Sequence, residues 1–146
     1  MTSIAYDENN PFAKILRGEL PSHKIYEDDH TFAFMDIMPR TDGHCLVIPK
    51  EPSRNLLDAD PETLARVIAT VQKVARAAKA AFNADGLSID QFNEAPAGQT
   101  VFHLHFHVLP RFEGVALRPH AGEMADHAVL AEHATRIRQQ LEATAS

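Results

Sequence analysis

The chain has 146 residues, of which 45% are apolar and 23% charged, and its formal net charge is −6 at pH 7. These values suit one folded domain and exclude disordered and collagen-like chains. No apolar run approaches the ~20 residues of a membrane-spanning helix, and the N-terminus is acidic where a secretion signal is basic, so we expect a cytoplasmic protein without membrane contact. The 14 Lys and Arg are scattered, which argues against polymeric nucleic acid as a partner.

Hydrophobic periodicity predicts short strands and helices along the chain. The clearest element is a long helix, because Asp60 is a good N-cap, Pro61 suits a first helical position, and apolar residues then recur at spacings of three and four as far as Phe82. In chain order, the predicted elements are a helix over residues 11–17, two strands of a hairpin within 23–36, a strand over 44–48, the helix over 61–82, strands over 87–92 and 100–109, and a C-terminal helix marked by Leu130, Ala134, Ile137 and Leu141. Mostly antiparallel neighbours with one inserted helix predict an α+β fold, with an antiparallel sheet of about five strands in one domain spanning residues 1–146.

Three histidines, His103, His105 and His107, occupy alternate positions in the apolar segment from Val101 to Leu109. Because the side chains of a strand alternate between its faces, the three rings are predicted to share one face. The other face, packed against the long helix, would hold Phe102, Leu104, Phe106 and Val108. A merely solvated strand face would carry the same titratable ring three times only by accident, so we expect a functional site.

Two kinds of chemistry suit these histidines. A His-x-His pair on a strand has a common metal-ligand spacing, and a third ligand with a water would make a hydrolytic zinc site. The preceding loop offers only one carboxylate for such a site, that of Glu94. Alternatively, one imidazole is a nucleophile towards phosphorus, while its neighbours orient it and neutralise the phosphate.

The segment from His103 to Leu109 has the pattern His-φ-His-φ-His-φ-φ, where φ is apolar, and resembles the signature of the histidine triad (HIT) nucleotide hydrolases and transferases. Other segments that resemble this family, in the same order, are 12–15, 18–21, 34–37, 43–50, 97–101 and 109–111. The resemblance is greatest to the phosphoramidase-like (Hint-type) and bacterial HIT proteins and implies the HIT-like fold. It covers roughly residues 10–113, and the C-terminal helical extension over 114–146 matches nothing in it.

The resemblance implies a role for each matching residue. His105 would be the nucleophile that attacks the α-phosphate of a nucleotide and becomes a nucleoside-phosphohistidine, which water then hydrolyses. His107 would support the nucleophile and contact the phosphate, and His44 and His103 would line the site from its other side. The implied substrate-binding residues are Asp36 at the ribose hydroxyls, Asn93 on the phosphate side, and Gln99 and Thr100 near the scissile bridge.

From the residues alone, three of these substrate-binding residues have a plain structural alternative. Asn93 and Gln99 could cap loop backbone, and Asp36 could start the turn before Pro39. Their agreement in order with the family pattern favours the functional interpretation.

The expected function is hydrolysis at the α-phosphate of a purine nucleoside phosphoramidate or dinucleoside polyphosphate. Two alternatives come from other classes: a His-ligated metallohydrolase, and a nucleotide-binding interaction protein with little turnover. The resemblance also implies a homodimer, with the helix over 61–82 and the strand over 87–92 as the expected contact surfaces.

No cofactor is expected, and the chain departs from many bacterial-type relatives at a metal site. Those relatives carry Cys-x-x-Cys at the start of the N-terminal helix, and with the histidines that match His44 and His103 it makes a structural zinc site. In this chain Asn10 and Ala13 stand at the two cysteine positions. A structural zinc site needs four ligands and only two would remain, so we expect no bound metal.

No catalytic or ligand-binding role is expected for the cysteine or for the remaining histidines. Cys45, the single cysteine, alternates away from His44 and is expected as a buried thiol that forms no disulfide. His127 and His133 are six positions apart, which is not a same-face helical spacing, so both are expected at the surface. No role is expected for His23, His30 and His120. The residues predicted for the core rather than for ligand contacts are Ile15, Phe32, Phe34, Leu46, Ile48, Val67 and Val71.

Overall fold

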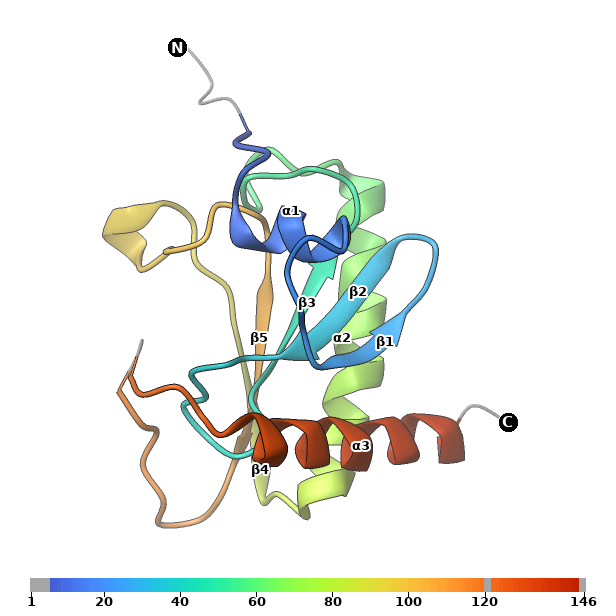
Figure 1. Cartoon of the computed structure of the whole chain (residues 1–146), viewed down its shortest axis with the longest axis vertical. Helices are drawn as coiled ribbons and strands as arrows, with labels where there is room; N and C mark the ends of the chain where they lie inside the picture. Colours follow the sequence, from blue (N-terminus) through green and yellow to red (C-terminus); the bar gives the residue numbers. More distant parts are fainter. Residues whose placement is uncertain (1–5, 120–121, 145–146) are drawn as a thin grey trace.

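The computed structural model describes residues 6–119 and 122–144, so His120 lies outside the described residues (Figure 1). The elements in chain order are helix α1 (Pro11–Leu16), strands β1 (Lys24–Glu27), β2 (Thr31–Met35) and β3 (Cys45–Pro49), helix α2 (Pro61–Phe82), strand β4 (Gly86–Asp90), the 3-10 turn η1 (Ala95–Ala97), strand β5 (Phe106–Arg111) and helix α3 (His127–Thr144). The strands form one sheet in the order β1-β2-β3-β5-β4, with every pair of neighbours antiparallel. The predicted α+β class and five-stranded antiparallel sheet are confirmed. Within the described ranges, no helix is long and apolar enough to cross a membrane.

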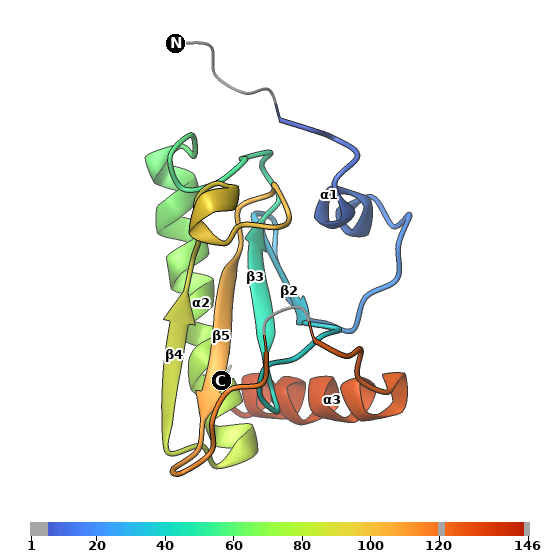
Figure 2. The ribbon, with the colours of Figure 1, turned by 90° about the vertical axis from the view of Figure 1, so that its left-hand side faces the viewer.

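The two faces of the sheet have unequal cover (Figure 2). One face packs against α2, and α3 runs across the end of the same core. This core includes Ala33, Met35, Cys45, Val47, Phe106 and Val108 from the strands, Val67, Val71 and Val74 from α2, and Leu130, Ala134 and Ile137 from α3. On the opposite face the six-residue helix α1 packs Phe12 against Phe32, Phe34, Leu46 and Ile48. A helix of this length is too short to cover the whole face, which leaves room for a cavity beside it.

Helix α2 has the predicted bounds because both of its ends are specified by local residues. Oδ1 of Asp60 accepts the backbone N–H of Glu62 at 2.9 Å, and Pro61 occupies the first helical position. Asn83 ends the helix in the left-handed conformation, with φ 49°. The bounds of α1, β3 and β4 differ from the predicted ones by one or two residues.

The fifth strand is shorter at its start than predicted. Alternation predicts a strand over 100–109, whereas β5 begins at Phe106, so residues 100–105 lie outside it. Its pairing with β3 stops where Val47 faces Phe106. Two residues further along β3, Pro49 has no N–H to donate, and its carbonyl oxygen accepts a hydrogen bond from the His103 ring instead.

The apolar side of the histidine segment largely follows the predicted pattern. Leu104, Phe106 and Val108 belong to the core on the α2 side. Phe102 does not, because its ring lies under the guanidinium of Arg54, 4.2 Å from the guanidinium carbon. Cys45 is completely buried in the same core, as predicted, and burial raises the pKa of its thiol.

Gly43 closes the turn before β3 in a conformation that other residues rarely adopt. Its φ is 86°, and a Cβ added there would lie 2.7 Å from Cε2 of Phe82 and 3.1 Å from Cγ of Pro110. The absence of a side chain therefore lets this turn pack closely on the end of α2 and on β5, which sets the position of the next residue, His44.

We expect Gly43→Ala to lower the free energy of unfolding by about 3 kcal/mol, because it adds left-handed strain and a steric clash. Gly18→Ala is the matched control, since Gly18 also has a positive φ, 77°, but has no atom within 4 Å of an added Cβ. Strain alone should cost the control about 1 kcal/mol. Urea denaturation measures the free energy of unfolding of both variants. Equal losses would show that the contact between the added Cβ and Phe82 does not destabilise the protein.

Candidate functional site

A cavity of about 450 Å³ opens on the sheet face that α1 covers only in part. It brings together five of the predicted site residues: Asp36, His44, Thr100, His105 and His107. Asn93, Gln99 and His103 do not line it. Most of the remaining wall is apolar and includes Pro11, Phe12, Ile15, Leu20, Pro21, Phe34, Ile37, Leu46 and Val101. Apolar walls with a few converging polar groups suit a small organic molecule.

The buried rings of His44 and His107 share a hydrogen bond whose direction follows from their other contacts. Nδ1 of His44 accepts the backbone N–H of Arg40 at 3.0 Å, so this nitrogen carries no proton. The proton of His44 is therefore on Nε2, which donates to Nδ1 of His107 at 3.0 Å and lies 3.4 Å from Oδ2 of Asp36. Because Nδ1 of His107 accepts, neutral His107 carries its proton on Nε2. The two rings thus form a chain of donors that ends in the Nε2–H of His107.

His105 is held in the tautomer that carries its proton on Nδ1. Its Nδ1 lies 2.7 Å from the carbonyl oxygen of His103, and because a carbonyl can only accept, Nδ1 carries the proton. The lone pair of the neutral ring is then on Nε2, on the far side of the ring. The rings of Phe12 and His107 both stand edge-to-face to that of His105, each with centroids 5.0 Å away. A hydrogen bond and two aromatic neighbours therefore fix the orientation of this ring.

His103 is fully buried, and the structure places it away from the cavity wall that it was predicted to share with His44. Its Nε2–H donates to the carbonyl oxygen of Pro49 at 2.8 Å, and its Nδ1 accepts from the hydroxyl of Tyr6. Desolvation lowers the pKa of this imidazole to about 4, so the ring is neutral near pH 7. What His103 contributes to the site is its backbone carbonyl.

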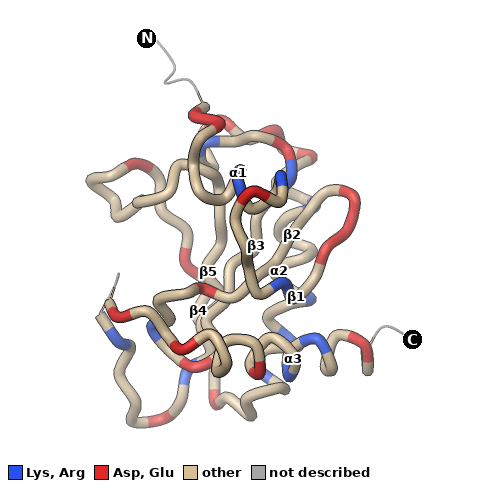
Figure 3. Tube along the Cα trace, in the orientation of Figure 1, with Lys and Arg blue, Asp and Glu red and all other residues tan. Residues whose placement is uncertain are grey.

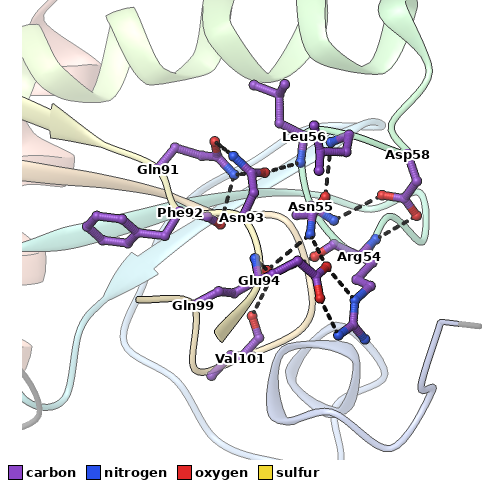
Figure 4. Close-up of polar contacts among 11 residues, drawn as sticks. Arg54, Asn55, Leu56, Asp58, Gln91, Phe92, Asn93, Glu94, Gln99 and Val101 are labelled. Carbon is purple, nitrogen blue, oxygen red and sulfur yellow. Dashed lines mark hydrogen bonds and ion pairs between the residues drawn. The ribbon is translucent and has the colours of Figure 1, made fainter. Parts of the chain in front are cut away.

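Gln99 and Asn93 tie two loops together beside the cavity (Figure 4). Oε1 of Gln99 accepts from Asn55 Nδ2 at 3.1 Å and from the backbone N–H of Glu94 at 2.7 Å. Its Nε2 donates to two backbone carbonyls, those of residues 54 and 101, at 2.8 and 3.0 Å. Oδ1 of Asn93 accepts the backbone N–H of Leu56 at 2.9 Å. Both amides therefore bond within the protein, as in the structural alternative for these residues, and they hold the segment that leads to Thr100.

Glu94 is the strained residue of this loop network. Its φ of 75° and ψ of 157° lie in a region that is nearly exclusive to glycine. Its carboxylate accepts from Nε and Nη2 of Arg54 at 2.8 and 2.9 Å, and from Nδ2 of Asn55 at 2.6 Å. Because three charge-assisted or short hydrogen bonds end on one carboxylate, they hold the backbone in this unfavourable conformation.

Several residues that line the cavity are not predicted from the sequence as site residues. Phe34 and Leu46 are buried in the core and Ile15 packs against it, as predicted, but all three also line the cavity, which the pattern does not indicate. Alternation identifies their face correctly but does not show that α1 leaves this face open. The C-terminal extension adds Met124 and His127, for which no motif gives a signal. His127 is exposed, as predicted, and its Nδ1 lies 3.1 Å from Nε2 of His23.

Asp36, His44 and His107 are the one group in the described residues whose arrangement resembles a metal site, with donor atoms all within 4.8 Å of one another. A histidine that binds a metal through one nitrogen normally donates the N–H of the other to an acceptor. His44 does the opposite, because its Nδ1 accepts from Arg40. Metal binding at Nε2 would leave this ring with no proton at all, so the group fits a chain of hydrogen bonds better than a metal centre.

Comparisons with known proteins find one family. The HIT domain family matches residues 17–114. A crystal structure of a Hit-like protein involved in cell-cycle regulation from Bartonella henselae, with an unknown ligand, is 57% identical, and the match covers 93% of this chain and 99% of that one with a TM-score of 0.88. A Zn-bound histidine triad family protein from Mycobacterium smegmatis is 38% identical, covering 92% of this chain and 94% of that one with a TM-score of 0.81. The adenylylsulfatase HINT3 of Arabidopsis thaliana is 38% identical over 102 residues, which are 70% of this chain and 52% of that protein.

A structural zinc ion, as the family resemblance implies, does not fit the residues at the start of α1. Oδ1 of Asn10 caps this helix by accepting the backbone N–H of Ala13 at 2.9 Å, and Ala13 has no side-chain donor. Both ring nitrogens of His103 are used by Tyr6 and Pro49. His44 and His103 also lie at opposite ends of β3, about 16 Å apart for five residues of strand. The implied pairing of these two histidines in one site is therefore wrong for this chain.

We expect purified protein to contain far less than one zinc ion per chain, and a chelator to change neither its Tm nor its activity. Elemental analysis before and after dialysis against EDTA, followed by thermal unfolding, measures both expectations. One tightly bound zinc per chain, with a lower Tm after chelation, would contradict them. Activity that is lost with the metal and restored by adding it back would support a metallohydrolase instead.

Proposed function

Because the chain belongs to the HIT domain family, we propose that it is a nucleotide hydrolase in which His105 attacks the α-phosphate of the substrate. The observation that carries the proposal is the hydrogen bond from Nδ1–H of His105 to the carbonyl oxygen of His103, which leaves the nucleophilic lone pair on Nε2. Family membership and similarity to a protein named as an adenylylsulfatase support, in general terms, hydrolysis at a nucleotide phosphate.

In the first step a bond forms between Nε2 of His105 and the α-phosphorus, and the bond to the leaving group breaks with its electron pair on that group, which takes a proton from water. The ring keeps its Nδ1 proton and becomes a cation. Its hydrogen bond to the carbonyl of His103 strengthens, because the donor is now charged. An interaction that is stronger in the transition state than in the free enzyme accelerates the step. A water then attacks phosphorus and gives one proton to solvent, while the bond from phosphorus to Nε2 breaks with its electron pair on Nε2; this releases the nucleoside monophosphate and restores neutral His105.

The other groups of the cavity bind the nucleotide. The Nε2–H of His107 donates to a non-bridging phosphate oxygen, and the chain from His44 keeps this donor in place. Asp36 accepts from the ribose hydroxyls while its Oδ1 also accepts the backbone N–H of Met38 at 2.8 Å. The purine base lies against the apolar wall, and the exposed Thr100 hydroxyl is on the side of the leaving group. The leaving group is the amine of a phosphoramidate, or the nucleoside with the remaining phosphates when the substrate is a dinucleoside polyphosphate.

We expect His105→Asn to lower the single-turnover rate constant by ~10⁴-fold or more and to leave the dissociation constant for AMP within about threefold, since only the nucleophile is lost. Rapid-quench assays with adenosine phosphoramidate and diadenosine polyphosphates, together with calorimetry, measure both values. His30→Asn, an exposed histidine in the β1–β2 turn, is the control and should behave like the natural protein.

Three outcomes of this panel separate the alternatives. Absence of protein-bound nucleotide after an alkaline quench, which preserves a phosphohistidine, together with normal hydrolysis by His105→Asn, would exclude the phosphohistidine mechanism. AMP binding by the natural protein without turnover of any substrate would indicate a nucleotide-binding interaction protein. Faster turnover of one substrate class identifies the leaving group.

We also propose that the protein is a homodimer joined through α2 and β4. β4 is at the edge of the sheet, next to α2 (Figure 2). Ile89 on β4 and Ile68 on α2 are 42% and 51% exposed, and Leu56 and Leu57 are exposed just before α2. Large apolar side chains exposed on neighbouring elements support a protein interface there.

Light scattering should give a mass near twice the 16.2 kDa of the chain at micromolar concentration. Ile89→Lys should shift the protein towards the monomer, because it puts a charge at the proposed interface. Val129→Lys is the matched control, since Val129 is 43% exposed on α3, away from β4. A natural protein that is monomeric at this concentration, or two variants that behave alike, would contradict the proposal.

The charge distribution supports a small-molecule substrate rather than polymeric nucleic acid. Lys and Arg are dispersed among acidic residues along the chain, and no continuous basic band is visible over the described residues in this view (Figure 3). Some of the basic side chains are also paired within the protein, as Arg54 is with Glu94. A protein that follows a phosphate backbone presents its positive charge as a continuous surface.

A further inference from the structure

The N-terminal segment reaches the histidines from outside the sheet at Tyr6. Its hydroxyl donates to Nδ1 of His103 and accepts from Nδ2 of Asn10, at 2.9 Å from that nitrogen. The rings of Tyr6 and His103 stand edge-to-face, with centroids 5.6 Å apart. Asn10 in turn caps α1, and that helix places Phe12 against the ring of His105. One short segment therefore touches both the nucleophile and the residue that fixes its tautomer.

The carbonyl of His103 is positioned by one backbone hydrogen bond of its own peptide unit together with side-chain contacts. Residue 103 lies outside β5, which begins at Phe106, so sheet hydrogen bonds do not hold it. The neighbouring N–H of Leu104 donates to the carbonyl of Ser53 at 2.8 Å. Leu104 is buried in the core on the α2 side, and the imidazole of His103, held on one side by Pro49 and on the other by Tyr6, is a further constraint on this peptide.

We propose that Tyr6 is a positioning residue for catalysis, acting on His105 through His103. The hydroxyl of Tyr6 fixes the His103 ring, the ring fixes the carbonyl, and the carbonyl fixes the proton of His105 on Nδ1 and the direction of its Nε2. This inference rests on the proposed function of His105 as nucleophile. At the start of α1 the family resemblance implies a structural zinc ion, which the residues of this chain do not fit. In its place, the hydrogen bonds of Tyr6 with Asn10 and His103 connect the N-terminal segment to the histidine segment.

A purely structural role for Tyr6 predicts a different result. If its hydroxyl only anchored the N-terminal segment, its loss would lower stability or weaken nucleotide binding through Phe12, and the rate of the bound complex would not change. If it positions the nucleophile, the rate constant of the chemical step falls while binding is kept.

The test compares Tyr6→Phe with Tyr26→Phe, which alters the only other tyrosine of the chain. Tyr26 also uses its hydroxyl, which donates to Oδ2 of Asp28 at 3.0 Å, but it lies on the α2 side of the sheet. We expect Tyr6→Phe to lower the rate constant for transfer of the nucleotide to His105 about tenfold, with AMP affinity unchanged. Tyr26→Phe should leave both unchanged.

A second variant and a second measurement complete the test. Asn10→Asp keeps an oxygen that can cap α1 but offers the Tyr6 hydroxyl a competing acceptor, so it should also slow transfer of the nucleotide to His105.

In ¹⁵N NMR of the free proteins, His105 should be protonated on Nδ1 in the natural chain and show a mixture of tautomers in Tyr6→Phe. Natural transfer rates and an unchanged His105 tautomer in both variants would overturn the inference. If the natural protein forms no nucleotidyl-histidine, the proposed function fails instead, and the NMR result still decides whether Tyr6 controls the ring.

Discussion

The hydrogen bond from His105 to the carbonyl of His103 determines what the histidine cluster can do. Imidazole has two nitrogens, and only a fixed acceptor at one of them keeps the lone pair at the other. Here the acceptor is a backbone carbonyl just before β5, where the chain is no longer in the sheet. The surroundings of this carbonyl, from the end of β3 to the N-terminal segment, therefore help to decide which nitrogen of His105 carries the proton.

The unequal cover of the sheet explains why the cavity is where it is. The 22-residue helix α2 and the helix α3 fill one face, and strand alternation puts Cys45, Val47, Phe106 and Val108 on that side. The same alternation puts Leu46 and His107 on the other side, where a helix of six residues covers only part of the surface. The core on the α2 side gives a rigid support, and the polar rings lie on the side that a ligand can reach.

Sequence reasoning is accurate where local residues decide the outcome. Asp60, Pro61 and Asn83 specify both ends of α2, and alternation identifies the face of His105 and His107. It is less accurate where contacts between distant segments decide. The pairing of β3 with β5 stops at Val47 and Phe106, although the sequence alternation continues back to residue 100. Tyr6, which is 97 positions away in the sequence, forms a hydrogen bond with His103. The side-chain amide of Gln99 can bind a phosphate or a loop equally well, and only the positions of Asn55 and Glu94 show that it binds the loop.

The backbone of Glu94 has a consequence for how this protein would respond to selection. Its conformation stores about 1–3 kcal/mol of strain, and the contacts with Arg54 and Asn55 offset it. A glycine here would adopt the same φ and ψ without strain, yet it would remove the carboxylate that joins the two loops. Such a change would remove the backbone strain, but without the carboxylate the segment that ends at Thr100 would be held less firmly. Stability and the fixed position of this loop therefore place opposite demands on this position. The strained backbone of Glu94 is thus the cost of placing a carboxylate where it can join the two loops.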